Sequence, residues 1–226
     1  MSDFWVRVLE LAMFVPAIVL HEVSHGYVSY KLGDPTAKSR GRLSLNPIKH
    51  VDPFGTLVLP LLLWLSGAPI FGYAKPVPID PRYYRDYRKG MFLTGLAGPT
   101  TNLTLALVAG IVVRLLSRGV LVTGTEAAPV VTVLGWVWYA LYFFAQINLV
   151  LMFFNLIPIP PLDGSSVLPL FLSNRALYTY YRLQRYAFPV LIALLWGVPA
   201  LFQVDPIGAY FRHTVDPLFN LLVPGR

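Results

Sequence analysis

Long apolar runs separated by short polar loops dominate the pattern of this chain. A helix needs about twenty apolar residues to cross a bilayer, and the runs at 4–30, 92–116 and 135–157 reach that length. Two weaker runs, 54–73 and 187–202, are broken by proline and glycine. The pattern predicts an all-α polytopic membrane protein, a bundle of about four to six transmembrane helices.

Composition supports a membrane protein and narrows its chemistry. Of 226 residues, 56% are hydrophobic and only 13% are charged, whereas about a quarter of the residues in a soluble domain are charged. The size suits a single membrane domain over 1–226. The chain has no cysteine, which excludes disulfides and cysteine-ligated metals. The net charge of +7 does not predict a nucleic-acid partner, because the basic residues lie between apolar runs as membrane topology requires.

The distribution of basic residues predicts the orientation in the membrane. Five lysines and arginines lie in 31–53 and five in 74–91, whereas the loop at 117–134 holds only Arg118. Cytoplasmic loops are enriched in basic residues, so the first two loops are expected to be cytoplasmic. The first span then runs from the outside to the inside, and its C-terminal end lies at the cytoplasmic side.

The first apolar run carries three ionisable side chains near its C-terminal end, in the sequence HEVSH. His21 and His25 are one helical turn apart and project from the same face, a spacing at which two imidazoles can bind one zinc ion. Glu22 lies beside them, where it can accept a proton from water at the metal. A chance match is the alternative, but ionisable groups inside an apolar run are functional candidates by default.

A third ligand is needed, because catalytic zinc sites usually have three protein ligands and an open position. Asp163 in NLIPIPPLDG follows a proline-rich break after the 135–157 run, and such a break is tolerated at membrane depth only inside protein or around a wet cavity. The alternative for Asp163 is an ordinary helix cap or turn before Gly164. The remaining histidines are His50 and His213, and nothing in the sequence places His213 near the motif.

Topology constrains whether Asp163 can meet the two histidines. The first span and the 135–157 span must run in the same direction, which requires an odd number of crossings between them. The 92–116 run supplies one crossing, and a full crossing by 54–73 would put Asp163 on the wrong side of the membrane. We therefore expect 54–73 to be a re-entrant or broken element that returns to the cytoplasmic side, as its proline and glycine content allows.

Three motifs together resemble the site-2 protease family of intramembrane zinc metalloproteases. They are HEVSH in the first span, GPTTN at 98–102 and NLIPIPPLDG at 155–164, and the resemblance covers about 10–165. HExxH alone has modest specificity, but HExxH followed by NxxPxxPLDG in a polytopic chain is highly specific. The family pattern is intact at every ligand position.

The resemblance implies a role for each residue of these motifs. It implies that one zinc ion is bound by two histidines and one aspartate, namely His21, His25 and Asp163. Glu22 is then the catalytic base. Asn155 would contact the substrate backbone or the oxyanion, and Asn102 is a further candidate for substrate binding. The alternative for both asparagines is a hydrogen bond that bridges two helices.

The resemblance also implies an architecture. The catalytic core would span about 4–165, followed by C-terminal membrane segments at about 166–226, in a minimal form without a PDZ or CBS domain. The stretch GYAKPVPI at 72–79 resembles the family's short membrane-associated β-hairpin, whose edge could hold an unwound substrate strand. His50 and Asp52 are candidates to gate access to the zinc, and the alternative for them is a polar loop with an Asp-Pro turn.

The function that follows is an intramembrane zinc endopeptidase. It would cleave the transmembrane segment of a single-span membrane-protein substrate near the cytoplasmic side of a bacterial or archaeal plasma membrane, with a regulatory partner as a further option. The alternative is a membrane zinc transporter or sensor without proteolytic activity. A transporter usually has several metal sites along a path and an internal repeat, whereas this sequence has one cluster at one depth.

Overall fold

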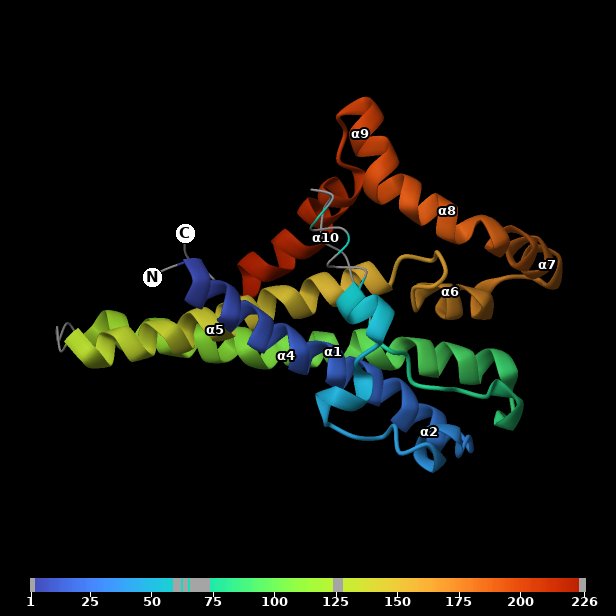
Figure 1. Ribbon diagram of the computed structural model, residues 1–226, viewed down its shortest axis with the longest axis horizontal. Coiled ribbons are helices and arrows are strands. Elements are labelled where there is room, and N and C mark those ends of the chain that lie inside the picture. The colour runs from blue at the N-terminus through green and yellow to red at the C-terminus, as the bar shows by residue number, and fades with distance from the viewer. Residues whose placement is uncertain (1–2, 59–61, 63–64, 66–73, 124–127, 224–226) are drawn as a thin grey trace.

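The computed structural model describes residues 3–58, 62, 65, 74–123 and 128–223, and this part of the chain is helical without any β-strand (Figure 1). The long helices are α1 (Asp3–Lys31), α4 (Tyr87–Thr123) and α5 (Ala128–Asn155). The shorter helices are α2 (Thr36–Ser39), α6 (Gly164–Val167), α7 (Asn174–Leu183), α8 (Ala187–Ile192), α9 (Val198–Phe202) and α10 (Pro206–Leu222).

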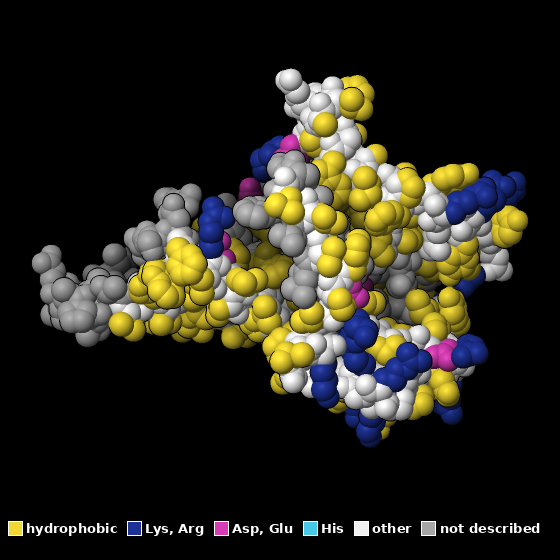
Figure 2. All heavy atoms as spheres, viewed as in Figure 1, with side chains coloured by type: hydrophobic (Ala, Val, Ile, Leu, Met, Phe, Trp, Pro, Cys, Tyr) yellow, Lys and Arg dark blue, Asp and Glu magenta, His cyan; other side chains and the backbone are white. Residues whose placement is uncertain are grey.

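Within the described residues, four helical segments are long and apolar enough to cross a membrane: Phe4–Lys31, Tyr87–Ser117, Val133–Asn155 and Asn174–Phe202. Large apolar side chains on them stay exposed, such as Leu11 at 63% and Leu115 at 60%. Lipid accepts such surface, whereas water would not. Figure 2 shows apolar side chains spread along the helices, with Lys and Arg gathered around α2 and on α7. The protein is therefore an integral membrane protein.

The last span is longer than the run predicted at 187–202. Helices α7, α8 and α9 follow one another without a break, because Gln184–Tyr186 and Ala193–Gly197 continue the helical path between them. The sequence pattern underestimated this span because the stretch before residue 187 is rich in tyrosine and arginine.

The core lies between α4, α5 and α10. Helices α4 and α5 pack side by side, and α1 and α10 pack against this pair (Figure 1). Ala106 and Ala109 on α4 face Ala145 and Leu149 on α5, and Phe219 of α10 completes the cluster. Small side chains at these positions let the helix backbones approach closely, which is how helices associate where there is no water to drive them together.

The direction of the helices brings the motifs to one region. Helices α1 and α5 run the same way and α4 runs against both (Figure 1). The C-terminal end of α1 and the start of α4 lie at the same end of the bundle, where the carboxylate of Asp34 accepts the N–H of Asp80 at 2.7 Å. The chain thus leaves α1 and enters α4 at one end, as the meeting of Asp163 with the histidines requires.

The predicted β-hairpin at 72–79 is not supported. Its first two residues lie outside the described part of the chain, and residues 74–80 form no strand. Pro76 and Pro78 have no N–H to give to a strand ladder, and the Val77 N–H between them donates to the Glu22 carboxylate instead of to a partner strand.

The re-entrant element predicted at 54–73 is likewise not supported. Most of it lies outside the described residues, and its first five residues belong to a short, wide helical segment, Pro53–Val58. The Asp52 carboxylate caps this segment by accepting the N–H groups of Phe54 and Gly55 at 3.0 and 2.7 Å.

Candidate metal centre

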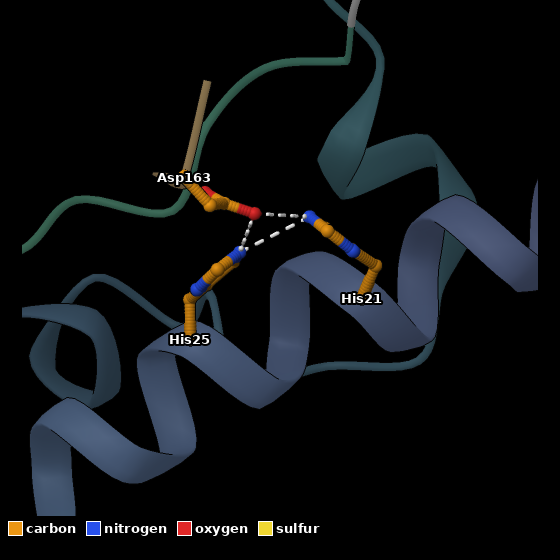
Figure 3. A group of neighbouring side chains, drawn as sticks. All are labelled: His21, His25 and Asp163. Carbon is orange, nitrogen blue, oxygen red and sulfur yellow. Dashed lines mark hydrogen bonds and ion pairs between the residues drawn. The ribbon is translucent and has the colours of Figure 1, made fainter. Parts of the chain in front are cut away.

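Three side chains that the sequence singled out converge near the C-terminal end of α1. His21 and His25 project from one face of α1, and Asp163 reaches them from the residue before α6 (Figure 3). The Asp163 Oδ2 atom lies 3.1 Å from His21 Nε2 and 3.2 Å from His25 Nε2, and the two Nε2 atoms are 3.1 Å apart.

The triangle fits a metal ion. In a tetrahedral zinc site with bonds of about 2.0–2.2 Å, neighbouring ligand atoms are separated by about 3.3–3.5 Å, close to the three distances observed here. Both histidines are buried, and Asp163 Oδ2 is buried without a hydrogen-bond partner among the described residues. A nitrogen–nitrogen–oxygen donor set in this geometry is one that zinc prefers.

The Nδ1 atom of each imidazole, which lies on the side of the ring away from the triangle, donates a hydrogen bond. His21 Nδ1 donates to the side-chain oxygen of Asn102, and His25 Nδ1 donates to the carbonyl of Thr94 at 2.6 Å. A proton on each Nδ1 leaves the lone pair on each Nε2, directed at the centre of the triangle. Such outer partners fix the tautomer and orientation of metal-ligating histidines.

The amide of Asn102 is itself held in place. Its nitrogen donates to Asn148 Oδ1 at 2.7 Å, and Asn148 Nδ2 donates to the carbonyl of Phe144 at 2.7 Å. Both asparagines are fully buried. A chain of hydrogen bonds therefore links α5 to α4 and α4 to His21. Asn102 is placed to orient His21, and its full burial keeps it from contacting a substrate in this arrangement.

Sequence reasoning missed Asn148 and Thr94. Asn148 could have been found from the sequence, because a polar side chain in the middle of the 135–157 apolar run is a functional candidate for the same reason as Asn102. Thr94 could not have been found, since its contact with His25 is made by a backbone carbonyl and every residue has a backbone carbonyl.

Glycines on α4 make room for the site. A Cβ on Gly98 would overlap both imidazole rings and would lie 2.6 Å from His21 Nε2. A Cβ on Gly95, one turn earlier, would lie 3.2 Å from the carbonyl oxygen of Asp163. The backbone of α4 thus forms one wall of the metal centre, and GPTTN contributes to the site by the absence of a side chain as well as by Asn102.

The electrostatics of Asp163, which lies outside the membrane-spanning helices, favour a charged ligand. Burial by itself raises the pKa of this carboxyl, but when the Nε2 atoms of His21 and His25 carry protons instead of a metal, their hydrogen bonds and charges outweigh burial and lower the pKa to about 2. Asp163 is therefore ionised near neutral pH, as a metal-binding carboxylate must be.

Glu22 points toward the segment after residue 73. Its Oε2 accepts the N–H of Val77 at 3.0 Å, so the carboxylate is held beside the histidines of its own helix. The second oxygen of a carboxylate can still accept a proton, since the group has about four lone-pair sites.

The other predicted residues lie away from the triangle or are engaged locally. Asn155 ends α5 and donates from Nδ2 to the Leu151 carbonyl at 2.9 Å. His50 is 3% exposed, and its Nε2 bonds to the carbonyl of Ser44 at 2.8 Å. His213 is on α10, where it bonds to a backbone carbonyl of its own helix.

Comparison with known proteins identifies the family. The chain matches the model of peptidase family M50 over residues 9–198. It is 35% identical over 196 residues to "Putative zinc metalloprotease YwhC" of Bacillus subtilis (strain 168), covering 87% of this chain and 80% of that protein. It is 30% identical over 217 residues to "Putative zinc metalloprotease Rip2" of Mycobacterium tuberculosis (strain ATCC 25618 / H37Rv), covering 96% and 74%. No solved structure matches the chain significantly.

These matches confirm the resemblance that the three motifs indicated. The catalytic class also follows, since the relatives carry the name of zinc metalloproteases and the family implies a zinc cofactor. The chain belongs to peptidase family M50, the site-2 proteases, and is a membrane-embedded zinc metalloprotease.

Proposed function

We propose that this protein is an intramembrane endopeptidase that cleaves the transmembrane segment of a single-span membrane protein near the cytoplasmic side of a bacterial or archaeal plasma membrane. The depth of the site supports this, because His21 and His25 lie within a membrane-spanning helix close to its end. The side of cleavage follows from the basic segments 31–53 and 74–91 that flank this end.

The observation that carries the proposal is the convergence of His21, His25 and Asp163, with both histidines held through Nδ1. Ligands prepared in this way bind one metal ion per chain and leave a coordination position for water or substrate. Within the described residues, this is the one cluster of three possible ligands. A zinc carrier would use several such sites along a path, so the protease is favoured over a transporter or sensor.

The chain's own residues supply proton transfer and positioning. A zinc ion held by the triangle supplies Lewis-acid polarisation of the scissile carbonyl and makes nearby water more acidic. Glu22 takes the proton from the attacking water and returns it to the leaving amine. Asn102 fixes the ring of His21 through the hydrogen bond at Nδ1.

Asn155 keeps its proposed role in substrate binding, and His50 with Asp52 a proposed role in access. Asn155 lies on the same connection that leads from α5 to Asp163, so its amide can reach a peptide laid along that connection once it leaves the Leu151 carbonyl. The His50 carbonyl accepts the Lys75 N–H at 2.9 Å, which links this part of the loop to the segment that holds Glu22.

The test compares zinc content and cleavage of a single-span model substrate in detergent or liposomes. Glu22→Gln should retain one zinc per chain and lose cleavage, because the amide keeps the shape of the carboxylate but cannot accept the proton. Asp163→Ala should lose zinc. Glu10→Gln is the matched control, since Glu10 lies on the same helix and bonds only to Tyr139 at 2.7 Å among the contacts found. Cleavage by Glu22→Gln at the wild-type rate would refute the mechanism.

A further inference from the structure

Residues Ala74–Asp80 form a strap that runs past the candidate base. Lys75 and Val77 both precede proline, which restricts them to extended backbone, and Pro76 and Pro78 fix their own φ angles. The strap is tied to the first part of the chain at both ends and in its middle. The ties are hydrogen bonds to His50, Arg42, Glu22 and Asp34.

The middle tie is the contact with Glu22. In the stretch Pro76–Pro78, Val77 alone has an N–H, and that N–H donates to Glu22 Oε2 at 3.0 Å. The Val77 side chain is 5% exposed and packs over Gly26, where a Cβ would lie 2.7 Å from Val77 Cγ1. The Val77 N–H is thus the one donor that this proline-flanked stretch offers to the Glu22 carboxylate. The Val77 side chain is fixed against Gly26, one turn of α1 after Glu22.

The C-terminal tie is made by Asp34, which is completely buried. Its Oδ2 accepts from the Asp80 N–H at 2.7 Å and from Ser29 Oγ at 2.8 Å, and its Oδ1 accepts from the Thr36 N–H at 2.9 Å. Burial works against ionisation of Asp34, but these hydrogen bonds outweigh it and lower the pKa of the carboxyl. Charge-assisted bonds of this kind are the stronger ones.

The N-terminal tie is made by Arg42 and the His50 backbone. Arg42 Nη2 donates to the carbonyls of Lys75 and Pro76 at 2.7 and 3.4 Å, and the His50 carbonyl accepts the Lys75 N–H at 2.9 Å. Arg42 is 8% exposed, an unusual burial for a guanidinium. A buried arginine and a buried aspartate therefore hold the two ends of one short segment.

Asp34 is also connected to the other side of the metal centre. Ser29 Oγ, which donates to Asp34, is 2.8 Å from Tyr84 Oη, and Tyr84 Oη is 3.0 Å from Thr94 Oγ1. The Thr94 carbonyl accepts from His25 Nδ1. This chain of hydrogen bonds ends at the Thr94 side chain, whereas the Thr94 carbonyl that holds His25 belongs to the backbone of α4 and is positioned by that helix.

We propose that Asp34 and Arg42 are positioning residues: they fix the Ala74–Asp80 strap so that the Val77 N–H holds the Glu22 carboxylate in place beside the two histidines. The inference rests on the proposed function, in which Glu22 is the base. Neither residue touches the metal triangle, so their loss should disturb proton transfer while leaving metal binding intact. The residues that position the base Glu22 are then different from the residues that position the metal ligands.

The kinetic test removes the donor. Val77→Pro deletes the N–H in a stretch that already accepts proline, and we expect kcat to fall about tenfold or more with KM and zinc content unchanged, since a hydrogen bond to a charged group is lost. Ile79→Pro is the matched control, because no hydrogen bond of the Ile79 N–H is found among the described residues, and it should keep wild-type kcat. Wild-type or higher kcat in Val77→Pro would overturn the proposal, as would equal losses in both variants.

A second measurement is independent of any cleavage assay. Hydrogen–deuterium exchange at the amides of 74–80 should rise tenfold or more in Asp34→Asn and in Glu22→Ala, while Glu10→Ala stays at the wild-type rate. Zinc content of Asp34→Asn should equal that of wild type. Unchanged exchange in Asp34→Asn would overturn the anchoring role. If exchange at 74–80 rises in the two variants as expected but the wild-type protein cuts no substrate, the proposed function fails while the role of Asp34 in fixing the strap stands.

Discussion

Gly98 offers a sharp test of how tightly the metal centre is built. In Gly98→Ala the new Cβ would lie 2.6 Å from His21 Nε2 and closer still to the His25 ring, whereas ordinary contact begins at 3.4 Å. Both imidazoles must therefore retreat, His21 Nε2 by about 0.8 Å and the His25 ring by more. A zinc site tolerates ligand displacements of about 0.2 Å, so the triangle cannot survive in its present form.

The expected effect is a loss of zinc affinity larger than the loss of stability. Overpacking of this kind costs about 1–3 kcal/mol, and the gain in helix propensity from glycine to alanine offsets about 1 kcal/mol of that. Disturbing the support of a metal ligand costs about 10–100-fold in metal affinity, and displacing two ligands at once should cost at least that much. The fold should therefore persist while zinc binding weakens by 100-fold or more.

The assay is competition between the protein and a zinc chelator of known affinity, alongside thermal unfolding. Gly110→Ala is the control: it lies on the same helix and its Cβ would meet Leu222 Cβ at 2.9 Å, a similar crowding far from the metal centre. It should change stability and leave zinc affinity unchanged. If Gly98→Ala binds zinc as tightly as the wild type, the two histidines do not form the metal site in the arrangement described.

Two further predictions follow from the buried hydrogen bonds. Asn148→Leu should lower zinc affinity by about 10–100-fold in the same competition assay, because Asn102 loses the partner that orients it toward His21; Ser117→Ala, which removes the link from Trp138 to α4, should affect only stability. The lowered pKa of Asp34 means that its ionisation stabilises the fold above about pH 4 and that this stability is lost as pH falls through the folded-state pKa. The melting temperature of the wild type should fall on acidification, and that of Asp34→Asn should fall less steeply.

The spans and the ligands were accessible to sequence reasoning because each has a strong local signal. Apolar runs of twenty residues predicted α1, α4 and α5, and the i, i+4 spacing of His21 and His25 placed two side chains on one face. Asp163 was a candidate because it follows a proline-rich break, the crossing count allowed it to meet the histidines, and its role as a ligand came from the resemblance to the site-2 proteases. The spans and the shared face of the two histidines need only periodicity, whereas the complete ligand set needed the resemblance as well.

Helix α10 was not predicted, because Arg212, His213 and Asp216 interrupt its apolar residues along the sequence, so they never form a continuous apolar run. It packs on α4 and α5 through one stripe, with Val215 and Phe219 in the core. A twenty-residue hydropathy criterion detects helices that are apolar on all sides and misses those that are apolar on one.

The wrongly predicted hairpin at 72–79 shows a second limit of prediction from the sequence, namely contacts between distant residues. The stretch around Lys75–Pro78 was expected to pair as strands, yet its prolines remove the donors that a ladder needs. Its actual partners, Glu22, Asp34 and Arg42, lie 33 to 55 positions away. Which backbone groups meet which side chains over that separation depends on the packing of the whole end of the bundle, and no local pattern encodes it.

The hydrogen-bond chain through Asn148 and Asn102 couples metal binding to helix packing. Helix α5 contributes to the site twice, through the Asn148 amide in its middle and through the connection after Asn155 that carries Asp163. The amide chain can form only if α1, α4 and α5 hold one register, and the triangle can form only in that same register. A ligand that binds the folded state alone stabilises it by mass action, so zinc should stabilise this particular packing of three helices against all others. The buried amides then have a second effect: in a bilayer an unpaired amide is costly, and a slip of α5 along α4 would unpair two of them together.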